Sequence, residues 1–76
     1  MITVKLYGLI RIESGIKQLQ LEARDVNELL GLLSDCGIAK KDLAGCVIRV
    51  NGTDATKRSK LTHGDTVVLM SPVAGG

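Results

Sequence analysis

The sequence predicts an α+β fold in which one main helix packs across one face of a mixed sheet of four to five strands. Three observations favour this class. Apolar and polar residues alternate near both ends of the chain, a central segment has apolar residues at helical spacing, and turn signals separate these segments. The chain has 76 residues, of which 45% are hydrophobic and nearly all aliphatic, so we expect one domain with one small core.

Two strands are expected at the N-terminal end. Apolar side chains alternate with other residues over 2–7, which is typical of a half-buried strand. Residues 8–15 have a glycine at each end and are expected to form a connecting loop. Residues 16–21 then resume as a second strand, the simplest hairpin partner of the first.

The main helix is predicted to start after Asp25. Asp25 can cap the free amides, and Glu28 follows three residues later, as in a capping box. Gly37 is well placed to end the helix in a Schellman-type turn, in which Ile38 contacts Leu33. The helical spacing gives one apolar face, made of Val26, Leu29, Leu30 and Leu33.

The second half of the chain alternates between short elements and turns. Residues 40–44 are expected to form a helical turn, and 46–50 a third strand that stops at the turn signal Asn51-Gly52. The stretch through Lys60 has room for a minor strand. Residues 61–65 then read as another turn.

The last strand is predicted over residues 66–70. Pro72 has no amide proton, so regular strand pairing must stop there. We therefore divide the single domain into a globular body, residues 1–71, and a flexible C-terminal tail, residues 72–76.

Composition excludes several classes of function. Tyr7 is the only aromatic residue, which disfavours nucleic-acid binding by base stacking. The net charge of +2 favours neither DNA nor a membrane surface. No apolar run approaches the roughly 18 residues of a membrane span, and the N-terminus lacks a signal-peptide pattern. We therefore expect a cytoplasmic protein that is monomeric when free.

The cysteines and the histidine do not form a recognisable site. Cys36 and Cys46 are neither a CxxC pair nor a disulfide framework, and both are interpreted as structural. A persulfide on either would be an alternative sulfur chemistry. His63 has no second histidine or nearby cysteine with which to bind a metal, so no metal site is expected.

The diglycine end is the feature with the clearest chemical meaning. Gly75 and Gly76 have no Cβ atoms, so this end of the chain could enter a channel too narrow for other residues. A terminal carboxylate becomes electrophilic once it is adenylated, and a sulfur or nitrogen nucleophile can then attack it. The alternative is an ordinary frayed terminus, but such termini are usually polar and rarely follow an apolar strand so closely.

Several segments together resemble the MoaD/ThiS family of β-grasp sulfur carriers, which are relatives of ubiquitin. The resemblance covers essentially the whole chain, and its most specific parts are the Leu-x-x-Gly-Asp turn and the C-terminal motif. The segments are Val4-Lys5-Leu6-Tyr7, the loop with Arg11 and Gly15, Val50-Asn51-Gly52, Leu61-Thr62-His63-Gly64-Asp65, and Pro72-Val73-Ala74-Gly75-Gly76.

The resemblance implies a β-grasp (ubiquitin-like) fold and a carrier that is not catalytic alone and binds no cofactor. An E1-like adenylating enzyme would use ATP to adenylate Gly76, which would then become a thiocarboxylate. Pro72 and Val73 favour the small subunit of molybdopterin synthase, whose large subunit would receive the sulfur on a pterin precursor. Alternatives are a thiamine-pathway carrier serving thiazole synthase, a protein modifier joined to lysines through Gly76, and a plain interaction module.

Partner recognition is expected on the sheet face away from the helix. Strand alternation directs Val4, Leu6, Ile48, Val50, Val67 and Leu69 toward the helix. The opposite face would carry a docking patch for the partner enzymes, bordered by a residue at the base of the turn. The patch comprises Tyr7, Val47, Val68 and Met70, with Leu61 at its border.

Two further groups of residues complete the expected site. In the tail, Pro72, Val73, Ala74 and Gly75 would be recognised by the partners, next to the reactive Gly76. Four cations could steer an acidic partner or a phosphate-bearing substrate, although a solvated charged surface is the simpler interpretation. These cations are Arg11, Lys57, Arg58 and Lys60.

Overall fold

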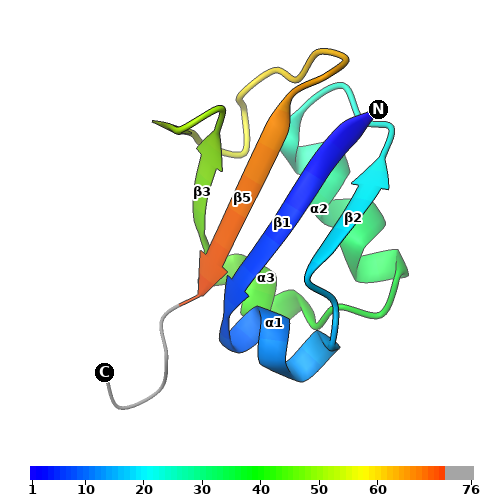
Figure 1. Cartoon of the computed structure of the whole chain (residues 1–76), viewed down its shortest axis with the longest axis vertical. Helices are drawn as coiled ribbons and strands as arrows, with labels where there is room; N and C mark the ends of the chain where they lie inside the picture. Colours follow the sequence, from blue (N-terminus) through cyan, green and yellow to red (C-terminus); the bar gives the residue numbers. More distant parts are fainter. Residues whose placement is uncertain (72–76) are drawn as a thin grey trace.

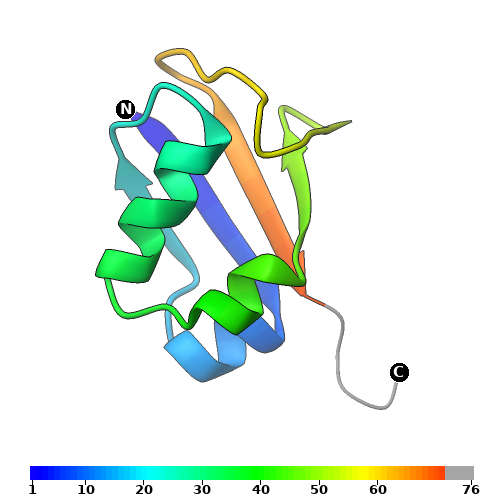
Figure 2. The same ribbon diagram turned by 180° about the vertical axis from the view of Figure 1, so that it is seen from behind.

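The structure, a computed structural model, describes residues 1–71, so the predicted tail with its reactive Gly76 lies outside the described residues. Figures 1 and 2 show the helices on one face of a single sheet, while the other face is open. The predicted α+β, β-grasp class is confirmed. In chain order the elements are β1 (Ile2–Gly8), α1 (Leu9–Ser14), β2 (Gln18–Leu21), α2 (Val26–Asp35), α3 (Lys40–Ala44), β3 (Val47–Val50), β4 (Thr53–Asp54) and β5 (Thr66–Ser71).

The sheet places the first and last strands side by side at its centre. Its strand order is β2-β1-β5-β3-β4, and β1 and β5 are parallel while the other pairs are antiparallel. The predicted pairing of β1 with β2 is confirmed, although β2 begins at Gln18 rather than at residue 16. This topology brings the end of β1 and the end of β5 to the same edge of the molecule (Figure 1).

The core lies between the sheet and α2, as the alternation predicts. Val4, Leu6, Val67 and Leu69 of the central strands are buried, and the four apolar residues of α2 cover them. On β3, Ile48 and Val50 are half-buried and pack against this core. Because β1 and β5 supply the centre of the core, their outward-facing residues are held in fixed positions on the open face.

The ends of α2 have the predicted cap residues, although the Glu28 side chain accepts the Arg24 amide at 2.9 Å and not the Asp25 amide that a capping box would use. The Asp25 side chain accepts a hydrogen bond from the Glu28 amide at 2.8 Å. At the other end Gly37 has a φ of 102°, and the Ile38 amide donates to the Leu33 carbonyl at 3.2 Å, as a Schellman turn requires.

The prediction of a loop over residues 8–15 is wrong, because most of this segment is the helix α1. Gly15 has a left-handed φ of 73° and ends the helix rather than a loop. The first turn of α1 is capped from far away, since the Ile10 amide donates to the Ser71 side chain at 2.7 Å. Local sequence gives no sign of that contact, and a six-residue helix is marginal without it.

In the second half of the described residues the predicted elements are present, although β3 begins at Val47 rather than at residue 46 and β5 ends at Ser71 rather than at residue 70. α3 covers the predicted helical turn, and the minor strand is β4. Asn51 and Gly52 both have positive φ, 51° and 82°, as expected for the tight turn between β3 and β4. Within residues 1–71, no helix is long and apolar enough to cross a membrane.

Candidate functional site at the end of the last strand

The end of β5 is fixed by its contact with the end of β1. Ser71 is the partner of Gly8 in the parallel pair and is 6% exposed. Gly8 has a φ of 77°, and a Cβ added there would lie 2.0 Å from the Ser71 carbonyl oxygen, so only glycine fits. The Ser71 hydroxyl holds α1 through the Ile10 amide. The residue that precedes the 72–76 segment is therefore anchored on two sides.

An exposed apolar row crosses the open face at this same end of the sheet. Met70 is the register partner of Tyr7 on β1 and of Val47 on β3. The side chains of this apolar row, Tyr7, Met70 and Val47, are 39%, 47% and 53% exposed. The predicted exposure of these three residues is confirmed, while their role in docking stays a prediction. Val68 also faces this side and is half-buried.

Leu61 does not border this face. It is 6% exposed and belongs to the core cluster. Its amide donates to the Arg24 carbonyl at 2.9 Å, next to the bridge between Asp25 and Lys60. This pairing turns the Leu61 side chain inward, beneath the turn, so its predicted place in a docking patch is wrong.

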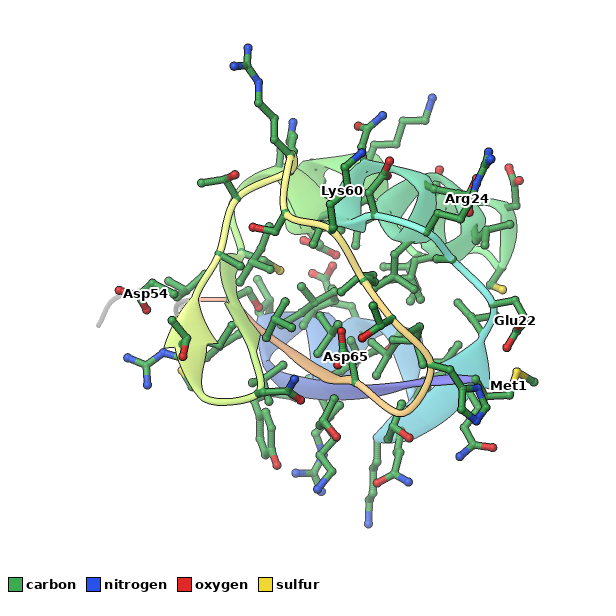
Figure 3. The ribbon with its side chains drawn as sticks, turned by 90° about the horizontal axis from the view of Figure 1, so that it is seen from above. Met1, Glu22, Arg24, Asp54, Lys60 and Asp65 are labelled. Carbon is green, nitrogen blue, oxygen red and sulfur yellow. The ribbon has the colours of Figure 1, made fainter. Side chains whose placement is uncertain are left out.

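The four predicted cations are divided between distant parts of the molecule. Arg11 lies on α1, which packs against β5 near its end. Lys57, Arg58 and Lys60 lie in the loop between β4 and β5, and Figure 3 places Lys60 on the same side of the sheet as α2. They do not form one electrostatic patch beside the tail.

Two cations that the sequence analysis did not select lie on the open face. Lys5 and Arg49 are the register partners of Val68 on either side, one row behind the apolar row. Arg49 forms an exposed ion pair with Asp54 at 3.3 Å. The alternation that selected Tyr7 and Val47 also contained this information, because Lys5 and Arg49 share their parity. The open face is thus apolar near the end of β5, at the apolar row, and basic in the next row, at Lys5 and Arg49.

Cys46 does not offer a competing nucleophile. The Cys46 thiol donates a hydrogen bond to the Asp42 carbonyl oxygen at 3.0 Å. Burial raises the pKa of Cys46, and the negative charge of Asp42 raises it further. The thiol therefore stays protonated at neutral pH, which disfavours nucleophilic attack. Cys36 is exposed at the C-cap of α2.

A pair of carboxyl groups, also missed in the sequence, joins α1 to α3. A side-chain hydrogen bond and charge repulsion with Asp42 raise the pKa of the exposed Glu13. Because 29 positions separate Glu13 from Asp42, no local sequence pattern indicates that they lie close together. Among residues 1–71 there is no group of three or more side chains suited to holding a metal ion.

Comparison with known proteins agrees with this geometry. The ThiS family matches residues 4–76. No curated protein matches the chain in sequence. A chain in the complex of subunits 1 and 2 of molybdopterin-converting factor from Helicobacter pylori is similar, with 28% identity and a TM-score of 0.75, over 99% of this chain and 97% of that one.

Two further solved structures share the fold. Urm1 from Trypanosoma brucei has 26% identity and a TM-score of 0.71, over 99% of this chain and 94% of its own. SAMP1 from Haloferax volcanii has a TM-score of 0.85 at 18% identity, over 99% and 98% of the two chains, and supports the fold alone. The family match extends over nearly the whole sequence, including the diglycine end, and the chain therefore belongs to the ThiS family of ubiquitin-like sulfur carriers.

Proposed function

We propose that this carrier holds sulfur as a thiocarboxylate on Gly76 and delivers it to the pterin precursor of the molybdenum or tungsten cofactor. In this role it is the small subunit of a cytoplasmic molybdopterin synthase and is not catalytic alone. The observation that carries the proposal is the family match through residue 76, which includes the diglycine end. The 28% identical neighbour from molybdopterin-converting factor favours this branch of the family.

The proposed chemistry takes place on the terminal carboxylate. In the adenylating enzyme, a carboxylate oxygen of Gly76 attacks the α-phosphorus of ATP and displaces pyrophosphate. A hydrosulfide ion then attacks the acyl carbon and displaces AMP, which leaves the thiocarboxylate. Because Gly75 and Gly76 carry no side chains, this end of the chain can pass through a narrow channel to the reacting phosphate.

The globular body supplies recognition. The apolar row lies on the open face at the end of β5, so a partner that accepts residues 72–76 can also cover these side chains. Lys5 and Arg49 lie one row behind it and suit a partner whose contact surface is acidic at that place. The adenylating enzyme and the synthase large subunit would use the same face in turn and would therefore compete.

The decisive test removes the reacting group. Deletion of Gly76 should abolish adenylation and sulfur transfer, because the next carboxylate would fall short of the phosphate by about 3.3 Å, and even ~1 Å can cost on the order of a hundredfold in rate. Adding one residue after Gly76 should be nearly as damaging, whereas Gly75→Ala and Gly76→Ala should be milder. The assay is ATP-dependent pyrophosphate release with the cognate adenylating enzyme, followed by intact mass after sulfuration.

The same mass spectra separate the alternatives. Exchange of one oxygen for sulfur supports a carrier, and adducts on target lysines would support a protein modifier. Wild-type sulfuration of the Gly76 deletion would overturn the proposal and return attention to the cysteines. The sulfurated protein is then offered to a molybdopterin synthase large subunit and to a thiazole synthase, and turnover only with thiazole synthase would reassign the pathway.

Docking on the apolar row is tested by Met70→Asp. This change should weaken binding to both partners, since the new carboxylate would lose its hydration in an apolar interface. Ile12→Asp is a matched control, because Ile12 is a 72% exposed apolar residue on α1, outside the open face. Affinities come from calorimetric titration of folded variants. Equal losses for the two variants would show that the apolar row has no special role.

A further inference from the structure

A groove lies on the helix side of the molecule, away from the open face. It lies between α2, α3 and the loop that joins β4 to β5, and its volume is about 390 Å³. The exposed Ala44 and the edges of Leu30 and Leu43, which are 8% and 6% exposed, give it a largely apolar floor, and Lys40 and Lys57 also line it. Figure 2 shows these elements on the side of the sheet opposite to the apolar row.

Gly31 of α2 keeps part of this groove open. It lies in the middle of the helix, is exposed, and has no unusual φ. A Cβ added at Gly31 would meet no atom within 4 Å. Neither a turn nor a close contact therefore requires glycine here, and most other residues would favour the helix. The absence of a side chain at Gly31 leaves this wall of the groove uncovered.

The rim of the groove is basic and lacks ionic partners. Arg58 and Lys60 line a second hollow that adjoins the groove and shares Lys57 with it. Within residues 1–71, none of these three cations nor Lys40 takes part in an ion pair. Asp25, the cap of α2, also lines the second hollow and offsets part of its positive charge, but it does not line the groove.

The cations, rather than the start of α2, supply the positive potential. The Val26 amide donates to the Ser59 carbonyl and the Asn27 amide to the Lys57 carbonyl, each at 3.0 Å. With the Glu28 amide bound to its cap, the first turn has no free donor for a bound anion. The same bonds fix the loop on α2 and hold Lys57 at the groove.

We propose that this groove is a second docking site, which binds an acidic segment of a partner protein. An apolar side chain of the segment lies against Gly31, Ala44 and the exposed edge of Leu30, and its carboxylates approach Lys40 and Lys57. A free phosphate would leave the apolar floor uncovered. The only aromatic residue, Tyr7, lies on the opposite face, which disfavours single-stranded nucleic acid.

A second copy of this chain is a poor occupant. Its open face presents Lys5 and Arg49 behind the apolar row, and these would repel the basic rim. The groove does not depend on the sulfur chemistry. A partner bound there would leave the open face free, so that both faces could be occupied together.

The experiment selects ligands without assuming an identity for the partner. A random library of linear peptides is selected on the folded wild-type protein, and each enriched peptide is titrated into isotope-labelled protein and followed by amide chemical shifts. We expect acidic peptides with a large apolar residue, and saturable shifts at Leu30, Gly31, Ala44 and Lys57.

Charge and shape variants then test the groove itself. Lys40→Glu and Lys57→Glu should each weaken these peptides by about tenfold or more, whereas Lys17→Glu, an equal charge reversal on an exposed residue outside the groove, should leave affinity almost unchanged. Gly31→Gln should also abolish binding while its melting temperature stays at or above that of the wild type. A Gly31→Gln variant that stays folded but does not bind would show that the new side chain blocks the groove.

The following results would overturn the proposal. One is the absence of any enriched acidic peptide, and another is equal weakening by Lys17→Glu. Shifts confined to the apolar row would assign the peptides to the open face. Saturation of the groove by inorganic phosphate, single-stranded oligonucleotide or anionic lipid vesicles at affinities equal to the peptides would show a non-selective basic surface. Loss of sulfur transfer in the Gly76 deletion has no bearing on these outcomes.

Discussion

The two ends of the central β1–β5 pair are held by different physical means. At the start of the pair, the Met1 ammonium forms an exposed ion pair with Glu22 at 2.9 Å, and Asp65 accepts the Thr62 amide at 2.9 Å (Figure 3). At the other end, Ser71 and Gly8 fit by shape and by a buried neutral hydrogen bond. Charged groups take part in the contacts at the first end, beside neutral backbone hydrogen bonds, whereas the contact between Ser71 and Gly8 involves no charge.

This difference has a consequence for the proposed carrier. Exposed ion pairs contribute little and respond to salt and pH. A buried neutral hydrogen bond and a steric fit respond to neither. The anchor at Ser71 should therefore hold the root of the 72–76 segment in one place under conditions that loosen the opposite end. Each of the following predictions tests one side of this contrast.

The largest effect is expected for Gly8→Ala. At the φ of 77° and ψ of −148° of Gly8 a non-glycine residue costs about 1–3 kcal/mol, and the close approach to the Ser71 carbonyl adds a clash, so we expect a loss of about 3 kcal/mol or more. Gly15→Ala is a milder comparison, since Gly15 has a similar φ of 73° but lies in the αL region with a ψ of 6°, and no atom lies near its Cβ position. The free energy of unfolding in urea measures both. Equal losses would show that neither the contact with Ser71 nor the different ψ of Gly8 adds to the cost of a positive φ.

The next effect is expected for Ser71→Ala. Without the hydroxyl, the buried Ile10 amide loses its acceptor, which should cost about 1–3 kcal/mol. Ser14→Ala is a milder control, because the Ser14 hydroxyl accepts the Ile16 amide at a part-buried site that water can reach. Hydrogen exchange of the Ile10 amide should accelerate in Ser71→Ala alone. Unchanged exchange at Ile10 would exclude Ser71 as the cap of α1.

The same contrast explains which parts of the fold could be predicted from sequence. The strand alternation, the cap at Asp25, the turn at Gly37 and the Asn51-Gly52 turn are local patterns, and the structure confirms them. The helix α1 is not local, because its cap comes from a residue 61 positions away. The glycines at its two ends therefore resembled loop signals.

The candidate site shows the same limit. Tyr7, Val47 and Met70 share the open face because strand parity is a local property. Leu61 was misplaced because its orientation follows from the long-range bond to Arg24. Lys5 and Arg49 had the parity of the exposed row, but a search for apolar residues passed over them. Their relation to Val68 needs the register between three strands, which only the folded chain specifies.

The smallest effects concern pH, and they should have opposite signs in two carboxyl groups. The Thr62 amide and the Asn51 side chain lower the pKa of Asp65, so its stabilising contribution is present above the unfolded-state value, about 4, and is lost as pH falls through the folded value. Asp42 raises the pKa of Glu13, so the contribution of Glu13 is fully present below its unfolded-state value and is lost as pH rises through the folded one.

Melting temperatures of Asp65→Asn and Glu13→Gln, measured from about pH 3 to 7, test this sign difference. Asp65→Asn should melt below the wild type at neutral pH, and the gap should close on acidification, because the wild type then loses the same charge. Glu13→Gln should match the wild type in acid and melt slightly above it at neutral pH, where the wild type has the repelling pair. Glu13 is exposed, so added salt should reduce its gap by screening the repulsion from Asp42. Parallel trends in the two variants would contradict the assignment of attraction to the Asp65 turn and repulsion to the contact between α1 and α3.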